Sequence, residues 1–126
     1  MTNTFLLNDF YTLETSNKID DSSIKATIKL NVHHDIFKGH FEQMHVVPGV
    51  CQTQIIKEVL QQELGQNLAL TLGSNIKFTG MIIPTQHPSF ELELKYTKTE
   101  SQYVVDAQLF FETTIFTKFK GTFTIN

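Results

Sequence analysis

Apolar and polar residues alternate over several stretches of the chain, which is the pattern of β-strands that bury one face. The clearest stretch covers residues 24–32, where every second residue is apolar. Similar patterns predict further strands over residues 68–72, 76–78, 90–96, 103–111 and 119–125, with a hairpin turn over 98–101. Residues 5–13 alternate imperfectly and predict a first strand or an irregular lead-in, and the polar residues 17–23 predict a turn.

The period changes to that of a helix after residue 48. Apolar residues then recur at helical spacing up to about Leu64, at Val50, Cys51, Ile55, Ile56, Val59, Leu60 and Leu64. Pro48 suits the first helical position, because its fixed φ is helical and its missing N–H needs no partner there. Gly65 is a typical C-terminal stop. Residues 33–47 have no clean period and predict a loop.

One substantial helix after the second strand, with a long run of antiparallel strands around it, predicts an α+β fold. A sheet with one apolar face buries that face most economically by wrapping around the helix. We expect a single domain over residues 1–126, because the chain contains no linker, repeat or low-complexity tract. The edges of such a sheet are usually covered by a partner, so we also expect a symmetric dimer.

Composition and charge narrow the function classes. The chain has 126 residues, 40% of them hydrophobic, and a net charge of −3, which is a globular composition. All ten basic residues are lysine, and the absence of arginine argues against nucleic-acid recognition. The single cysteine excludes an intrachain disulfide and fits a reducing compartment. No secretion signal or membrane-spanning run is present, so the expected location is the cytoplasm, without membrane contact.

The candidate chemistry lies in residues 37–50, where a titratable group, flanking aromatics and a Pro-Gly corner precede the helix. Gly39-His40-Phe41 and the later Val46-Val47-Pro48-Gly49-Val50 resemble the signature of the hot-dog-fold 3-hydroxyacyl-thioester dehydratases of fatty-acid synthesis, the FabA/FabZ type. The order of elements agrees with that family along nearly the whole chain. Three departures stand out: Glu42 and His45 replace usual prolines, Thr79-Gly80 replaces an arginine pair, and Gln54 occupies the position of the catalytic carboxylate.

The resemblance implies a hot-dog fold and a site for acyl thioesters carried by phosphopantetheine, on acyl carrier protein or coenzyme A. His40 would be the general base, and the Gly49 N–H would bind the thioester oxygen as it gains negative charge. Gln54 would hold the substrate hydroxyl by hydrogen bonds, since an amide cannot act as an acid. The lining of an acyl tunnel is expected from Phe41, Val50, Phe78 and Met81. The resemblance implies no cofactor and no metal, and a homodimer that could assemble further.

Each candidate also has a plainer interpretation. His40 could be a structural loop histidine, and Gln54 could be a helix residue with no task. Glu58 lies one helical turn beyond Gln54 on the same face, so it could replace the missing acid or be an ordinary paired carboxylate. Cys51 fits a small core residue better than a nucleophile. The remaining loop histidines, His33, His34 and His45, match no compact zinc pattern.

Three functions therefore remain open from the sequence. A 3-hydroxyacyl-thioester dehydratase, a lyase of fatty-acid or related acyl-chain synthesis, agrees best with the motif. A non-catalytic subunit that binds acyl thioesters or a partner would explain the loss of the carboxylate at Gln54. A thioesterase shares the fold, although such enzymes commonly use a helix carboxylate to activate water.

Overall fold

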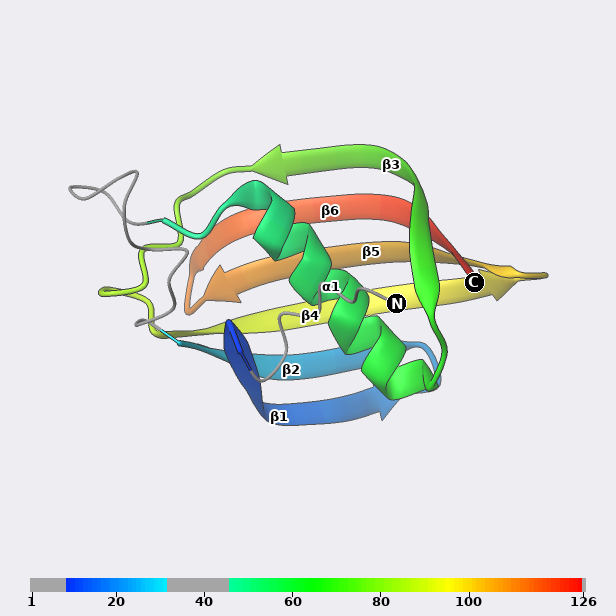
Figure 1. Ribbon diagram of the computed structural model, residues 1–126, viewed down its shortest axis with the longest axis horizontal. Helices are drawn as coiled ribbons and strands as arrows, with labels where there is room; N and C mark the ends of the chain where they lie inside the picture. The colour runs from blue at the N-terminus through cyan, green and yellow to red at the C-terminus, as the bar shows by residue number, and fades with distance from the viewer. Residues whose placement is uncertain (1–8, 32–45, 126) are drawn as a thin grey trace.

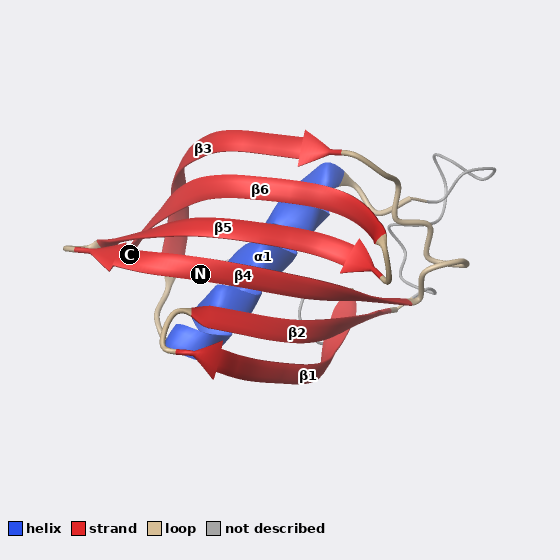
Figure 2. Cartoon of the chain, turned by 180° about the vertical axis from the view of Figure 1, so that it is seen from behind, coloured by secondary structure: helices blue, strands red, loops and turns tan. Residues whose placement is uncertain are grey.

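The computed structural model describes residues 9–31 and 46–125, except for the side chains of residues 72–74. Its elements, in chain order, are β1 (Tyr11–Asp20), β2 (Ser23–Leu30), α1 (Gly49–Leu64), β3 (Leu68–Phe78), β4 (Ser89–Thr99), β5 (Gln102–Phe111) and β6 (Thr114–Ile125). The strands form one antiparallel sheet in the order β1-β2-β4-β5-β6-β3. Figure 1 shows this sheet curled around α1, which crosses its concave face, and Figure 2 shows the same sheet from its outer side. This is the predicted wrapping of a sheet around one helix.

The core lies between α1 and the concave face of the sheet. The helix contributes four side chains with no exposed surface, Ile55, Ile56, Val59 and Leu60. Facing them are the alternate residues of the strands, which in β4 are Phe90, Leu92, Leu94 and Tyr96 and in β5 are Tyr103, Val105, Ala107 and Leu109. The intervening residues are exposed or partly exposed, as the period of two requires. The predicted strands at β2, β4, β5 and β6 and the predicted helix are confirmed.

The ends of the helix are determined by their residue types. Gly65 adopts the left-handed conformation, with φ of 66°, and its N–H donates to the carbonyl of Gln61 at 2.8 Å. At the other end Pro48 is extended, with ψ of 148°, so it is the N-cap and not the first helical residue as predicted. A cap residue keeps non-helical dihedrals while its carbonyl already accepts helical hydrogen bonds, here from Cys51 and Gln52.

The predicted turn over residues 17–23 is mostly wrong. Strand β1 continues to Asp20, and the turn is confined to Asp21 and Ser22 before β2 begins. Residues 17–20 pair with β2 through the backbone while their side chains are exposed. An edge strand that covers no core has no reason to alternate, so its polar residues look like a turn.

The other edge of the sheet is β3. On this strand Leu70 is 41% exposed, and Phe78 at its end is 53% exposed. Val50 and Met81 add further exposed apolar surface, and all four lie on α1, on β3 or just beyond it. Among the described residues no helix has the length and apolarity needed to cross a membrane.

Candidate active site

The N-terminus of α1 presents unpaired backbone N–H groups. In the described part of the chain no group accepts a hydrogen bond from the N–H of Gly49 or Val50, and the first turn contains no acidic side chain. The Pro48 carbonyl accepts from the N–H groups of Cys51 at 3.0 Å and Gln52 at 3.1 Å. Free N–H groups and the positive end of the helix dipole together favour an oxygen that gains negative charge.

Gly49 is necessary for the close contact between this helix end and β3. A Cβ atom at Gly49 would lie 2.7 Å from Cζ of Phe78 and 3.2 Å from two further carbons of its ring. Because glycine has no Cβ, the phenyl ring can lie directly against the helix backbone. The Phe78 ring therefore lies against the first turn of α1, beside Gly49.

A buried polar network anchors this helix end to the sheet. Gln52, on α1, is only 3% exposed; its Nε2 donates to the carbonyl of Val47 at 3.1 Å. Its Oε1 accepts a hydrogen bond from the hydroxyl of Thr117 on β6, a residue with no exposed surface. The N–H of Val47 donates to the carbonyl of Ile82 at 2.9 Å. The corner before Gly49 is thus held from both sides.

A second buried network joins α1 to β1. Glu58 is 2% exposed; its Oε1 accepts from the hydroxyl of Tyr11 at 2.9 Å and its Oε2 accepts from Nε2 of Gln54 at 2.8 Å. Burial, and secondarily the charge and hydrogen bond of Glu58, raise the pKa of Tyr11 far above its usual range. Burial and then the charge of Glu58 also raise the pKa of the buried Cys51 thiol. A nucleophilic thiolate would need the opposite shift.

The other residues proposed from the sequence lie in different surroundings. His40 and Phe41 lie outside the described residues, as do His33, His34 and His45. Val50 is 76% exposed and Met81 is 55% exposed, so neither is enclosed within this chain. Within the described residues no group of histidine, cysteine and carboxylate side chains is arranged to hold a metal ion.

Sequence reasoning missed Tyr11, Gln52 and Thr117 as parts of the site's framework. Tyr11 is 47 residues from Glu58, and Thr117 is 65 residues from Gln52. Glutamine at a buried helix position is the only local signal, since a buried amide must find partners elsewhere in the fold. The pattern alone does not name those partners.

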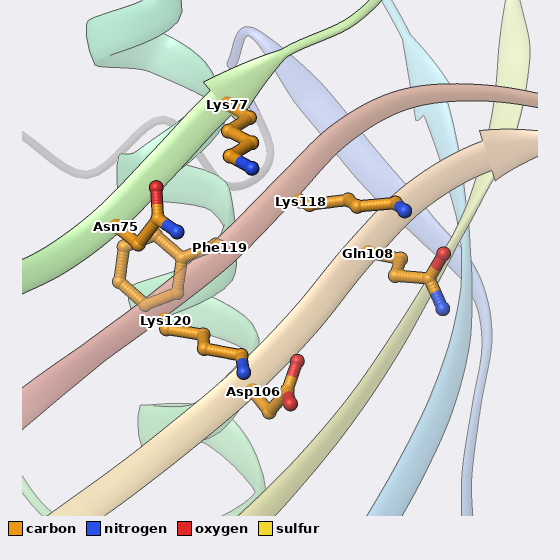
Figure 3. Close-up of a pocket in the computed structure, with 7 residues that line it drawn as sticks. All are labelled: Asn75, Lys77, Asp106, Gln108, Lys118, Phe119 and Lys120. Carbon is orange, nitrogen blue, oxygen red and sulfur yellow. The ribbon is translucent and has the colours of Figure 1, made fainter.

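A hollow of about 360 Å³ lies on the outer face of the sheet. It is lined by Asn75, Lys77, Asp106, Gln108, Lys118, Phe119 and Lys120, from β3, β5 and β6 (Figure 3). Lys118 and Lys120 alternate along β6 with Thr117 and Phe119, which are buried toward the helix. The hollow therefore opens on the opposite side of the sheet from α1 and does not contain the predicted acyl site.

Comparison with known proteins shows which class of protein this chain belongs to. The fold is that of the hot-dog proteins, a curled antiparallel sheet around one helix, and solved structures with this arrangement match nearly the whole chain. A family model described as ApeI-like, ApeI dehydratase, matches residues 15–115. The chain belongs to this ApeI-like dehydratase family. No curated protein sequence matches it.

Three solved structures illustrate the likeness. The dehydratase heterocomplex ApeI:P from Xenorhabdus doucetiae is 16% identical, with a TM-score of 0.72, covering 90% of this chain and 97% of that one. A Bacillus halodurans protein solved with CoA is 12% identical, with a TM-score of 0.58, and the match covers 89% of this chain and 73% of that one. A putative thioesterase from Shewanella oneidensis is 13% identical, with a TM-score of 0.52, and the match covers 89% of this chain and 83% of that one. At these identities the structures support the fold alone.

Proposed function

We propose that the protein acts on acyl thioesters as a 3-hydroxyacyl-thioester dehydratase of fatty-acid or related acyl-chain synthesis. The observation that carries the proposal is the helix N-terminus at Gly49, where the backbone N–H groups of Gly49 and Val50 bond no described residue and the Phe78 ring lies against Gly49, in a chain of the ApeI-like dehydratase family. The acyl group would be carried by phosphopantetheine, on an acyl carrier protein or coenzyme A. A hot-dog neighbour solved with CoA supports this class of ligand.

The proposed reaction removes water across two carbons. An imidazole nitrogen of His40 takes the proton from the carbon next to the thioester carbonyl, and the carbonyl oxygen gains negative charge. The Gly49 N–H, at the positive end of α1, stabilises that oxygen. The electron pair then forms the carbon–carbon double bond as the hydroxyl leaves. The His40 imidazolium returns its proton to that hydroxyl, which departs as water. Gln54 holds the hydroxyl in place, with no acid of its own.

A second copy would complete the site. Strand β3 is an open edge, and the exposed apolar residues Val50, Leu70, Phe78 and Met81 lie on it or close to it. Pairing of two such edges would bury them, and the resemblance to the dehydratases implies that Gln54 of one copy would then reach the Gly49 end of the other. Light scattering at micromolar concentration tests this pairing, and a monomer would contradict it.

The test is an enoyl-product assay with 3-hydroxybutyryl and longer 3-hydroxyacyl thioesters. We expect turnover by the wild type and a loss of about hundredfold or more in His40→Ala, since a positioned base contributes at least that much. The matched control is His33→Ala, which changes another histidine of the same segment and should leave the rate unchanged. An equal rate in His40→Ala would remove His40 from the mechanism.

A second function is favoured by one residue. Gln54 at the position of the family's acid, together with a neighbour solved as a dehydratase heterocomplex, suits a non-catalytic subunit that binds acyl thioesters or a catalytic partner. Saturable thioester binding without turnover would select this function, and Gln54→Glu should then create activity. Release of thiol without a double bond would instead select thioester hydrolysis.

A further inference from the structure

Gln54 is attached to its own helix by one end of its amide. Its Nε2 donates to Oε2 of Glu58 at 2.8 Å, four residues further along α1. Gln54 is half-buried, whereas Glu58 beneath it is only 2% exposed. The donor atom of the amide is therefore directed into the protein.

Glu58 itself is fixed from the other side. Its Oε1 accepts a hydrogen bond from the hydroxyl of Tyr11 at 2.9 Å, and Tyr11 has no exposed surface. Both carboxylate oxygens thus accept hydrogen bonds from side chains of two different elements, β1 and α1. A carboxylate held at both oxygens has little freedom to rotate, so its Oε2 presents a fixed acceptor to Gln54.

An amide has a donor end and an acceptor end, and a carboxylate accepts only. Turning the Gln54 amide over would place its Oε1 against the carboxylate oxygen, where two acceptors repel each other. Glu58 therefore selects one of the two amide orientations. In that orientation Oε1 of Gln54 is the end left for a ligand, and no described residue donates to it.

We propose that Glu58, held by Tyr11, is a positioning residue that makes Gln54 a hydrogen-bond acceptor toward the substrate, so that the site selects acyl thioesters with a hydroxyl at the third carbon. A 3-hydroxy group can donate to Oε1, whereas the carbonyl of a 3-oxoacyl thioester cannot and would meet two lone pairs. This inference rests on the proposed function, because it assumes that Gln54 faces the acyl chain.

The test measures ligand preference and not turnover. The probes are three unreactive pantetheine analogues with an amide in place of the thioester, carrying butyryl, 3-hydroxybutyryl or 3-oxobutyryl groups. Calorimetry with the wild type should give about tenfold tighter binding of the hydroxy than the oxo analogue, the worth of one hydrogen bond. Glu58→Gln should reduce this ratio to about one or invert it, because the new amide can donate to Gln54 and turn it over. Butyryl binding should stay the same in both proteins.

Two further variants separate positioning from folding. Tyr11→Phe removes one of the two hydrogen bonds that hold Glu58 but leaves the bond between Gln54 and Glu58 in place, so it should weaken the hydroxy preference without inverting it. Gln54→Leu removes the acceptor and should abolish the preference, and this variant tests the acceptor if Glu58→Gln fails to fold. A wild type that binds all three analogues equally, or a Glu58→Gln variant with an unchanged ratio, would overturn the inference alone. Failure of all three analogues to bind would overturn the proposed function with it.

Discussion

The hydrogen bond between Gln52 and Thr117 gives a direct test of how the helix end is anchored. Thr117→Val removes the hydroxyl that donates to Oε1 of Gln52 and leaves that buried oxygen without its partner. An orphaned buried acceptor costs about 1–3 kcal/mol. Gln52→Leu orphans two groups, the Thr117 hydroxyl and the Val47 carbonyl, so it should cost about 2–6 kcal/mol.

The double variant tests whether Gln52 and Thr117 are paired. In Gln52→Leu/Thr117→Val only the Val47 carbonyl loses a partner, so the double variant should be more stable than Gln52→Leu by about 1–3 kcal/mol. Urea unfolding of the four proteins, followed by circular dichroism, gives each free energy. Thr53→Val is the control. The Thr53 hydroxyl donates to the Val50 carbonyl on the exposed side of the same helix, so its loss should change the free energy of unfolding by about 0.5 kcal/mol or less. Additive single effects would refute the pairing.

Three other measurements test separate parts of the site. Gly49→Ala should shift the free energy of unfolding by less than about 1 kcal/mol, because the half-exposed Phe78 ring can rotate away from the new methyl group. A decrease of more than about 3 kcal/mol, measured by urea unfolding, would contradict this. Because burial raises the pKa of Cys51, its thiol should react with a thiol reagent at pH 8 more slowly in the folded than in the unfolded protein; equal rates would restore a reactive thiol. The fold keeps Tyr11 protonated, whereas the tyrosine of the unfolded chain ionises above a pH of about 10. Above that pH the free energy of unfolding of the wild type should therefore fall by up to about 1.4 kcal/mol per pH unit more than that of Tyr11→Phe. Parallel pH profiles of the two proteins would exclude this linkage.

The parts of the fold that bury one face could be predicted from sequence. Strand β4 and the helix show their periods clearly because solvent lies on one side and the core on the other. The strand between residues 14 and 20 could not be predicted, because almost all its side chains are exposed and only its backbone pairing keeps it extended. Val50 shows the reverse error: its spacing placed it in the apolar stripe of the helix, but its own side chain is 76% exposed in the chain alone.

The site could be predicted only as far as local residues define it. The Pro48-Gly49 corner and the helix that follows are adjacent in sequence, so their spacing reveals a helix N-terminus. The partners that hold this end are distant in sequence, and hydrogen bonds between Thr117 and Gln52 leave no periodic trace. The roles of His40, Gly49 and Gln54 remain predictions, which the binding and turnover experiments address.

The two buried networks together explain how the helix keeps one orientation. Apolar contacts are not directional, so packing alone would let α1 rotate or slide by a small amount at modest cost. Gln52 and Glu58 are buried polar groups whose partners lie on β6 and β1, at nearly opposite edges of the sheet. Each orphaned group would cost about 1–3 kcal/mol, so any movement that breaks either network is penalised. The helix is thereby fixed at two points, one next to Gly49 and one beside Gln54, the two residues that the proposed reaction needs in register.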